Sequence, residues 1–170
     1  DGPVSRAERV HKFLRERASK LAFVPWPLAE PRETPVMLAK EAFQAVEKDK
    51  GRARLYPLEV AVVAASLLRA VDVSALVAEL PDPGAEKTPL DPSGYLGYYV
   101  VAVYEAEPGQ GTPRLFDPYG ARSLPADAKA QVLSDKQVVG ALLSLRALYQ
   151  LAHRADPKAA LTQSSEALSL

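Results

Sequence analysis

The sequence has 170 residues, of which 48% are hydrophobic and 25% charged, as in an ordinary globular domain and unlike a disordered or fibrous chain. Its 21 Lys and Arg residues are balanced by 21 Asp and Glu residues, so bulk charge gives no reason to expect nucleic acid or an anionic membrane as a partner. The absence of cysteine excludes disulfides, thiolate nucleophiles and cysteine-based metal sites, and His11 and His153 lie too far apart for a helical zinc motif, so we expect no metal or other cofactor.

The sequence shows neither a membrane-spanning stretch nor a signal peptide. No stretch has the ~18 consecutive apolar residues of a membrane-spanning helix, and no signal peptide is visible, so we expect no membrane insertion. Because the sequence starts at Asp1 rather than at a methionine, we expect it to be a piece of a longer chain.

The N-terminal segment has the pattern of an amphipathic helix over residues 5–22. Apolar residues recur there at helical spacing, and Ser5 followed by Glu8 is typical of a capping box at a helix start. The opposite face is rich in Arg and Lys. We interpret it as a solvated helix face, with contact to an acidic partner as the alternative.

A proline-rich segment follows over residues 23–35. Because proline lacks a backbone donor, this segment is predicted to be an extended surface loop. Trp26 is interpreted as the side chain that pins the loop to the core, and ligand binding by its ring is the alternative. Thr34 and Pro35 are typical of a helix start and predict a second helix that continues to residue 47.

The most hydrophobic part of the chain begins at Pro57. Residues 58–73 are nearly all Ala, Val or Leu, and this length and alanine content predict a helix that is buried on most sides. A short strand is expected over residues 74–80. The proline-rich residues 82–94 then predict a long loop.

Two further strands are predicted to pair with each other. Residues 95–106 are β-branched and aromatic, which is typical of a strand, and residues 114–117 follow a glycine-rich turn and are expected to return antiparallel. A second turn is predicted over residues 118–120.

Tyrosines mark the longer of these strands. Alternation along the strand places Tyr98 and Tyr104 on one face of the sheet, and Tyr95 and Tyr99 on the other. One face has to pack in the core. The other is interpreted either as further packing or as one wall of a groove suited to an extended peptide, which Tyr56 and Tyr119 would complete.

The C-terminal quarter is predicted to be helical. Residues 124–133 predict a short helix, and residues 137–154 carry leucines and valines at the spacing of a long helix. Asp156 and Pro157 break that helix and lead to a last one over residues 158–170. The order of helices, a small antiparallel sheet and a helical hairpin predicts the α+β class.

Four short motifs follow one another along the chain. They are Arg54-Leu55-Tyr56-Pro57 before the apolar helix, Leu67-Leu68-Arg69-Ala70-Val71-Asp72-Val73 at its end, Gly97-Tyr98-Tyr99 in the long strand, and Leu115-Phe116-Asp117-Pro118-Tyr119-Gly120 at the end of the next strand and in the turn after it. This order resembles the transglutaminase-like (papain-like) core of bacterial proteins that carry a trailing tetratricopeptide repeat. That family opens its helix with Cys-Gly-x-Pro, and its strands read Gly-His-Phe and Phe-x-Asp-Pro-Phe-x-Gly. The resemblance implies N-terminal helices packed on a small antiparallel sheet.

The family's chemistry rests on a cysteine nucleophile, a histidine that transfers the proton and an aspartate that orients the histidine. Carried onto this sequence, the nucleophile falls at or near Arg54, the base at Tyr98 and the acid at Asp117. Arginine does not act as a nucleophile, and tyrosine, with a pKa near ~10, is a poor base at neutral pH. The resemblance therefore implies a degenerate member that lacks the inherited reaction.

The surviving carboxylate has two interpretations. Asp117 is either a functional remnant or a turn residue that accepts hydrogen bonds from neighbouring amides. As a further hypothesis, Arg54 forms an ion pair with Asp117 across the former site.

The C-terminal helices are similar to a tetratricopeptide hairpin. Small residues at the expected crossing positions and an Ala-Leu pair near the end carry this resemblance, at Ala160, Ala167 and Leu168. One such hairpin does not bury its own apolar face, so it either caps the core or continues into further repeats of a longer chain. We therefore expect a core over residues 1–134 and a hairpin over residues 135–170.

The function implied is a non-catalytic module that binds a protein or an extended peptide, with Tyr56, Tyr98, Asp117 and Tyr119 as the candidate binding residues. Two alternatives stay open. The first is a hydrolase or acyltransferase of altered chemistry on the same fold, for which Ser66 and Thr88 are the weak candidate nucleophiles. The second is a purely structural spacer within a larger protein.

Overall fold

The structure, a computed structural model, describes residues 2–18, 22–23, 36–48, 54–80, 98–118, 122–124 and 128–170. In chain order its elements are α1 (Pro3–Ala18), β1 (Ala22–Phe23), α2 (Ala39–Lys48), β2 (Arg54–Leu55), α3 (Pro57–Ala70), β3 (Ala75–Leu80), β4 (Tyr98–Val103), β5 (Arg114–Asp117), β6 (Arg122–Ser123), β7 (Gln131–Val132), α4 (Asp135–Tyr149), a π-helical turn (Gln150–Arg154) and α5 (Pro157–Leu168).

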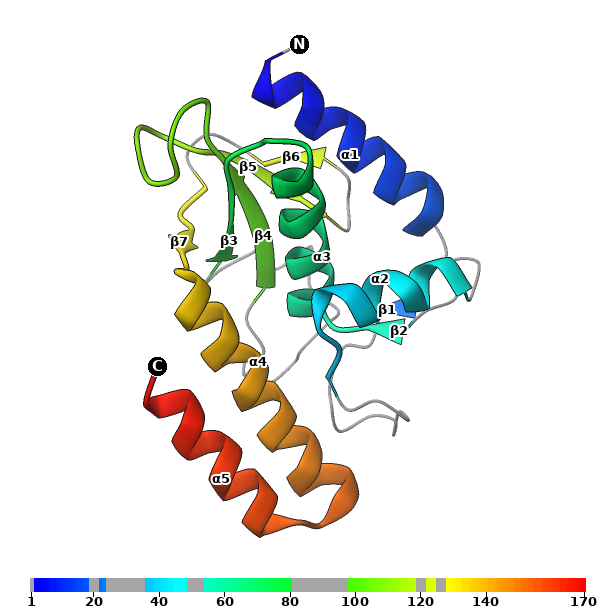
Figure 1. Ribbon diagram of the computed structural model, residues 1–170, viewed down its shortest axis with the longest axis vertical. Coiled ribbons are helices and arrows are strands. Elements are labelled where there is room, and N and C mark those ends of the chain that lie inside the picture. The colour runs from blue at the N-terminus through cyan, green and yellow to red at the C-terminus, as the bar shows by residue number, and fades with distance from the viewer. Residues whose placement is uncertain are drawn as a thin grey trace.

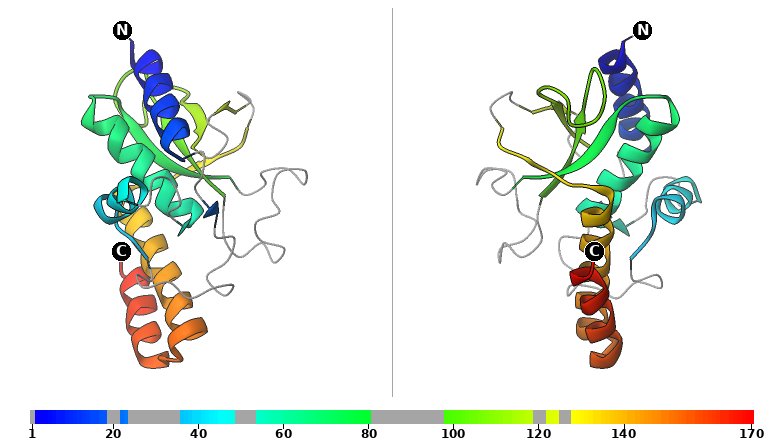
Figure 2. Two further views of the ribbon diagram at one scale, coloured as in Figure 1. Left: turned by 90° about the vertical axis from the view of Figure 1, so that its right-hand side faces the viewer. Right: turned by 60° about the vertical axis from the view of Figure 1, so that its left-hand side comes forward.

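The central sheet has the strand order β6-β5-β4-β3-β7, and all of its neighbouring strands are antiparallel. Helices α1 and α3 lie on one face of this sheet, and the α4–α5 hairpin extends from one end of the molecule (Figures 1 and 2). Strands β1 and β2 form a separate, parallel pair. The combination of helices with an antiparallel sheet confirms the predicted α+β class.

Helix α3 forms the centre of the core. The predicted apolar helix is confirmed, and it ends at Ala70, where Val71 and Asp72 turn the chain into β3. Asp72 adopts a left-handed conformation (φ 55°), and the Leu68 carbonyl accepts hydrogen bonds from the N–H groups of Val71 and Val73 at 3.1 and 3.0 Å. This arrangement satisfies the last carbonyls of the helix and reverses the chain.

A buried carboxylate fixes the start of α3. Glu59 is fully buried, and its side chain accepts hydrogen bonds from the backbone N–H groups of Met37 (2.6 Å) and Tyr56 (2.8 Å). The Tyr56 bond satisfies a donor at the beginning of α3, and the Met37 bond holds the segment that leads into α2. One side chain thus joins two parts of the chain that are distant in sequence.

The predicted strands are confirmed in β3, β4 and β5, and both faces of the sheet are covered. Val101 pairs with Phe116 and faces the cluster that contains α3. On the far face, Tyr104 packs with Leu115 in a second cluster, which is closed by loop residues such as Leu124. The predicted alternation is confirmed for the described tyrosines, because Tyr98 and Tyr104 join this far-face cluster whereas Tyr99 packs on the α3 side; Tyr95 lies outside the described residues.

Two predicted helix starts and one predicted helix are wrong. The Ser5 capping box does not form, because α1 begins at Pro3 and its first hydrogen bond runs from the N–H of Arg6 to the carbonyl of Gly2 (3.1 Å). Helix α2 begins at Ala39 rather than near Pro35. The Glu41 carboxylate caps its start by accepting a hydrogen bond from the Leu38 N–H (3.0 Å).

The short helix predicted over residues 124–133 is absent from the part of this segment that the structure describes. Gln131 and Val132 instead form β7 on the free edge of β3, in register with Glu79 and Ala78. The N–H of Leu133 continues this pairing with a 2.9 Å hydrogen bond to the carbonyl of Val77. Unpaired backbone groups at a sheet edge favour an added strand, and that tertiary effect outweighs the weak helical pattern.

The C-terminal hairpin is confirmed, with one irregularity. Ser134 caps α4 by accepting a hydrogen bond from the Gln137 N–H (3.3 Å), and Asp156 caps α5 in the same way through the Ala159 N–H (3.0 Å). Helix α4 ends in the π-helical turn, and Ala155 then adopts a left-handed conformation (φ 48°).

The two helices of the hairpin approach closely at a glycine. A Cβ atom placed on Gly140 of α4 would lie 3.3 Å from the carbonyl oxygen of Ala167 in α5. A side chain at this position would therefore require the two helices to shift by a few tenths of an ångström.

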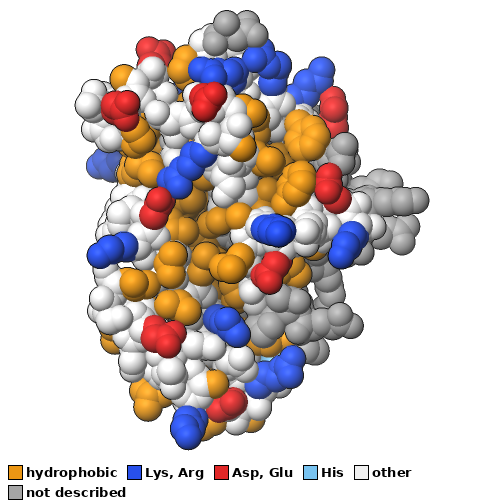
Figure 3. Space-filling view, in the orientation of Figure 1, with side chains coloured by type: hydrophobic (Ala, Val, Ile, Leu, Met, Phe, Trp, Pro, Cys, Tyr) orange, Lys and Arg blue, Asp and Glu red, His pale blue; other side chains and the backbone are white. Residues whose placement is uncertain are grey.

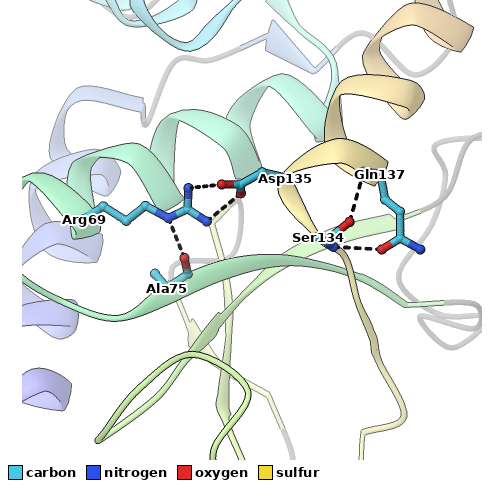
Figure 4. A network of polar contacts seen from close by, with 5 residues as sticks. All are labelled: Arg69, Ala75, Ser134, Asp135 and Gln137. Carbon is cyan, nitrogen blue, oxygen red and sulfur yellow. Dashed lines mark hydrogen bonds and ion pairs between the residues drawn. The ribbon is translucent and has the colours of Figure 1, made fainter. Parts of the chain in front are cut away.

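A polar contact attaches the hairpin to the core. The Arg69 guanidinium at the end of α3 donates through Nη2 to Asp135 Oδ1 (2.8 Å) at the start of α4, and through Nε to the carbonyl of Ala75 (2.7 Å) in β3 (Figure 4). Next to this contact, Ser134 and Gln137 form a reciprocal capping box. Arg69 thus connects α3, the sheet and the hairpin.

Candidate functional site

The residues predicted to replace the catalytic triad come from three strands: Tyr98 from β4 and Asp117 from β5, which pair with each other, and Arg54 from the separate β1–β2 pair. Arg54 belongs to β2, where its backbone pairs with Ala22, but its side chain lies outside the described structure, as does the whole of Tyr119. The predicted ion pair between Arg54 and Asp117 therefore stays a prediction. Tyr98 opens β4 opposite Leu80 and packs on the far face of the sheet, away from α3.

The other two candidate binding residues are buried. Tyr56 is 0% exposed and packs with Leu145 of α4, in a cluster separate from that of Tyr98. Asp117, at the end of β5, is 1% exposed. Neither side chain offers surface to a peptide, so the structure does not combine Tyr56, Tyr98 and Asp117 into an open groove.

Asp117 has a neighbour on α1 that the sequence pattern does not indicate. His11 of α1 is buried against β5, where its ring stacks on Phe116 with the ring centres 4.5 Å apart and the planes 18° from parallel. Asp117 acts on His11 electrostatically. A sequence signal for burial existed, because His11 shares a helical face with Ala7 and Leu14, which are also buried. Its pairing with β5 had no such signal.

The imidazole and the carboxylate do not constitute a working acid–base pair. Burial lowers the pKa of His11 to about 4, and the attraction of Asp117 opposes this only in part. Neither ring nitrogen has a hydrogen-bond partner among the described residues, and the ring is 3% exposed. A general base has to reach the proton that it removes, and His11 is enclosed between α1 and the sheet.

Charged residues close this cluster from outside. Arg114 lies over the Phe116 ring, 5.3 Å from its centre, and its guanidinium lies 3.5 Å from a carboxylate oxygen of Glu8. The resulting stack of Arg114, Phe116 and His11 fastens α1 to β5. We assign this cluster a structural role.

An open cavity lies on the other side of α1, where it meets the end of α3. Its volume is about 340 Å³, and its apolar lining includes Val10 and Phe13 of α1 and Leu67 of α3. Figure 3 shows apolar side chains gathered over α1 and α3 on this face, with Lys and Arg side chains along the upper border. The cavity is thus an apolar hollow beside positive charge, which suits a ligand that is both apolar and anionic.

The outer side of the hairpin is a second exposed apolar surface. Leu161 and Leu168 of α5, which we call the outer stripe, are 69% and 90% exposed. They are seven residues apart and so lie on one face of the helix. Ala160 is the one buried residue of α5, and it lies on the side that packs against α4.

Two further findings bear on the kind of site. The described residues contain no group of three or more His, Cys, Asp or Glu side chains that could hold a metal ion. Within the same described ranges, no helix has both the length and the apolar character needed to cross a membrane.

Comparison with known protein families gives no matching family model, and comparisons with curated proteins and with solved structures give no match. The resemblance to the transglutaminase-like family therefore stays a prediction from the sequence motifs.

Proposed function

We propose that this chain is a non-catalytic protein-binding module, formed by a degenerate transglutaminase-like core and a tetratricopeptide-like hairpin. The observation that carries the proposal is the outer stripe, where two leucines of one helix face are 69% and 90% exposed on a hairpin that extends from the core (Figure 1). Apolar side chains that are exposed in line on one helix face are typical of a site for protein contact.

The element order supports the core assignment. An apolar helix, a connecting strand, the strand that begins at Tyr98 and the strand that ends at Asp117 follow one another as in the family. The start of α3, where the family places its nucleophile, carries the Tyr56 and Glu59 contacts instead of a thiol. A helix start that is held by backbone hydrogen bonds keeps its shape without the catalytic side chain.

The hairpin supports the binding assignment. Helix α5 is stabilised by its cap at Asp156 and by packing of Ala160 against α4, so its outer face is ordered without a partner. A preformed helix face with apolar anchors seven residues apart matches the way in which amphipathic helices recognise each other. The partner of the outer stripe is accordingly an amphipathic helix of another protein segment.

The binding proposal is tested by selecting helical peptides from a displayed library against the whole chain. Peptides with apolar residues at helical spacing are expected to be enriched, and to lose at least about tenfold in affinity for the double variant Leu161→Gln/Leu168→Gln. Thr162→Gln, an exposed change outside the outer stripe, is the matched control and is expected to bind as the wild type does. Enrichment of no peptide, or equal binding by the double variant, would overturn the proposal.

The non-catalytic part is tested separately. Incubation with peptide, amide and ester substrates is expected to give no turnover above the uncatalysed rate. Asp117→Asn keeps the shape of the side chain and removes its charge, so a turnover that disappears in this variant, with an unchanged circular dichroism spectrum, would establish an altered catalyst in place of a binding module.

A further inference from the structure

We propose that the cavity between α1 and α3 binds an acidic peptide segment that places one large apolar side chain in the hollow and a carboxylate beside Arg6. This site is distinct from the outer stripe on α5, and it does not depend on the function proposed for that surface. Three observations support it: the size and lining of the cavity, the charge and hydrogen bonding of Arg6, and the apolar surface around the opening.

The cavity has the dimensions of an anchor pocket. Its volume of about 340 Å³ lies near the lower end of the range for ligand sites, about 300–1,000 Å³, so it has room for one or two large side chains. Phe13 of α1, Leu67 of α3 and Val71 in the turn after α3 give it an apolar lining, and Val71 is 41% exposed there. A buried apolar anchor in a pocket of this kind supplies much of the binding energy of a peptide complex.

Arg6 places a positive charge at the cavity that no carboxylate among the described residues neutralises. Its guanidinium lines the cavity and donates through Nη1 to the carbonyl of Val71 (2.8 Å), whereas its Nε is buried without an acceptor among the described residues. No carboxylate within those residues forms an ion pair with it. A half-buried guanidinium next to apolar surface favours an anion, because water solvates it poorly there and a carboxylate matches its donor geometry.

A second arginine extends the positive rim. Arg9 also lines the cavity, and its Nη1 donates to Ser5 Oγ at 3.3 Å, which is a weak contact at the surface of α1. Arg6 and Arg9 are three residues apart and so lie on one side of the helix. The positive charge of Arg6 beside an apolar hollow complements an acidic residue next to a large apolar one.

The surroundings favour a peptide over a small free acid. Apolar side chains continue beyond the hollow over α1 and α3, so a chain running across this face would cover surface that an isolated small molecule would leave exposed (Figure 3). The sequence pattern of the occupant is therefore a leucine or phenylalanine flanked by aspartate or glutamate.

The test uses the whole chain and three capped, fluorescent hexapeptides with Leu-Phe at the centre, flanked by Glu, by Gln or by Lys. Fluorescence anisotropy is expected to show binding of the Glu peptide about tenfold tighter than the Gln peptide, and no binding of the Lys peptide. Raising the salt concentration is expected to weaken the binding of the Glu peptide and to leave the affinity of the Gln peptide nearly unchanged.

Two variants locate the site. Arg6→Gln is expected to bring the Glu peptide down to the affinity of the Gln peptide, whereas Lys136→Gln, which removes an equal charge on α4, is expected to have no effect. Ala70→Trp, at an exposed position that lines the cavity, is expected to fill the hollow and abolish binding of both peptides without lowering the melting temperature.

The inference is overturned if the Glu and Gln peptides bind equally, if Arg6→Gln binds the Glu peptide as the wild type does, or if Ala70→Trp retains binding. Dodecanoate is the small-molecule arm of the experiment: binding of dodecanoate with no binding of any peptide would overturn the assignment of a peptide. None of these outcomes changes the selection on the α5 variants, so the two proposals fail independently.

Discussion

Helices α3 and α5 are of similar length, 14 and 12 residues, and yet they have opposite relations to the rest of the molecule. Nine residues of α3 are buried, whereas Ala160 is the one buried residue of α5. The first helix is fixed by what it packs against, and the second by its cap and by one neighbouring helix. Stability is therefore concentrated in the α3 region, whereas the outer face of α5 stays exposed.

The difference in packing between α3 and α5 is tested most directly by truncating one leucine in each helix. Leu68→Ala in α3 removes a fully buried side chain and is expected to lower the free energy of unfolding by about 3 kcal/mol. Leu161→Ala in α5 removes a side chain that is 69% exposed, so its effect is expected to stay within about 0.5 kcal/mol. Urea denaturation of both variants measures the difference. Equal losses would show that α5 is as tightly packed as α3.

A similar contrast concerns carboxylates. Glu59→Ala removes the carboxylate that accepts hydrogen bonds from the N–H groups of Met37 and Tyr56. It is expected to lower the free energy of unfolding by about 3 kcal/mol. Glu59→Gln keeps one acceptor oxygen and is expected to cost less. Glu166→Ala, an exposed position on α5, is the control and is expected to be nearly neutral. A neutral Glu59→Ala variant would contradict the role given to this side chain at the start of α3.

Acid is expected to lower the free energy of unfolding through the buried side chain of His11. The pKa of His11 is lowered by burial to about 4 in the folded protein, against about 6.5 in an unfolded chain. Between these values the unfolded chain binds a proton that the folded protein excludes, so the free energy of unfolding falls as the pH drops from about 6.5 to about 4, by roughly 3 kcal/mol in all. Above pH 6.5 this residue contributes no pH dependence.

The measurement is urea denaturation at pH 7, 6, 5 and 4, with His11→Phe as the comparison. Phenylalanine keeps the stacking on Phe116 and does not titrate, so this variant is expected to lose most of the slope over that range. It is also expected to equal or exceed the wild type at pH 7, because it removes buried nitrogens that have no partner among the described residues. An unchanged slope would show that His11 is not the titrating group.

The smallest expected effect lies at the joint between the two regions. Asp135→Asn weakens an ion pair with Arg69 whose side chains are 42% and 72% exposed, so the cost is expected to be about 0.5 kcal/mol or less. Arg69→Ala also removes the hydrogen bond to the carbonyl of Ala75, and is expected to cost more. A double-mutant cycle with both changes isolates the pair. A coupling energy well above this value would show that the joint holds the hairpin more firmly than its exposure suggests.

Much of the fold could be predicted because local pattern and final environment agree. The run of Ala, Val and Leu after Pro57 is helical and buried, and the β-branched residues of β4 form a central strand. The same agreement holds at Asp156 and Pro157, where cap and helix start coincide. In each case no distant part of the chain is needed to decide the local structure.

The elements that could not be predicted depend on such distant parts. Strand β7 exists because the edge of β3 offers unpaired backbone groups, which the sequence of residues 131–132 does not reveal. The late start of α2 follows from Glu41 and from the Glu59 contact with Met37, a bond that joins residues 22 positions apart.

The candidate site shows the same limit. Residue type suggested Tyr56 and Asp117 as groove residues, but both are interior, because the start of α3 and the end of β5 are covered by other elements. The cavity between α1 and α3 escaped prediction for the opposite reason. The sequence pattern predicts a solvated helix face for its arginines, whereas the packing of α1 beside the end of α3 half-buries Arg6 and turns that face into the rim of a hollow.

The close approach of α4 and α5 at Gly140 has a consequence for how the hairpin is oriented. Because a single added methyl group would meet the Ala167 carbonyl at 3.3 Å, the angle between the two helices depends on one missing side chain. Replacing Gly140 by alanine would act as a wedge and tilt the end of α5, and with it the direction in which Leu168 points. The direction of the proposed binding face could in this way be changed from inside the hairpin, with Leu161 and Leu168 left as they are.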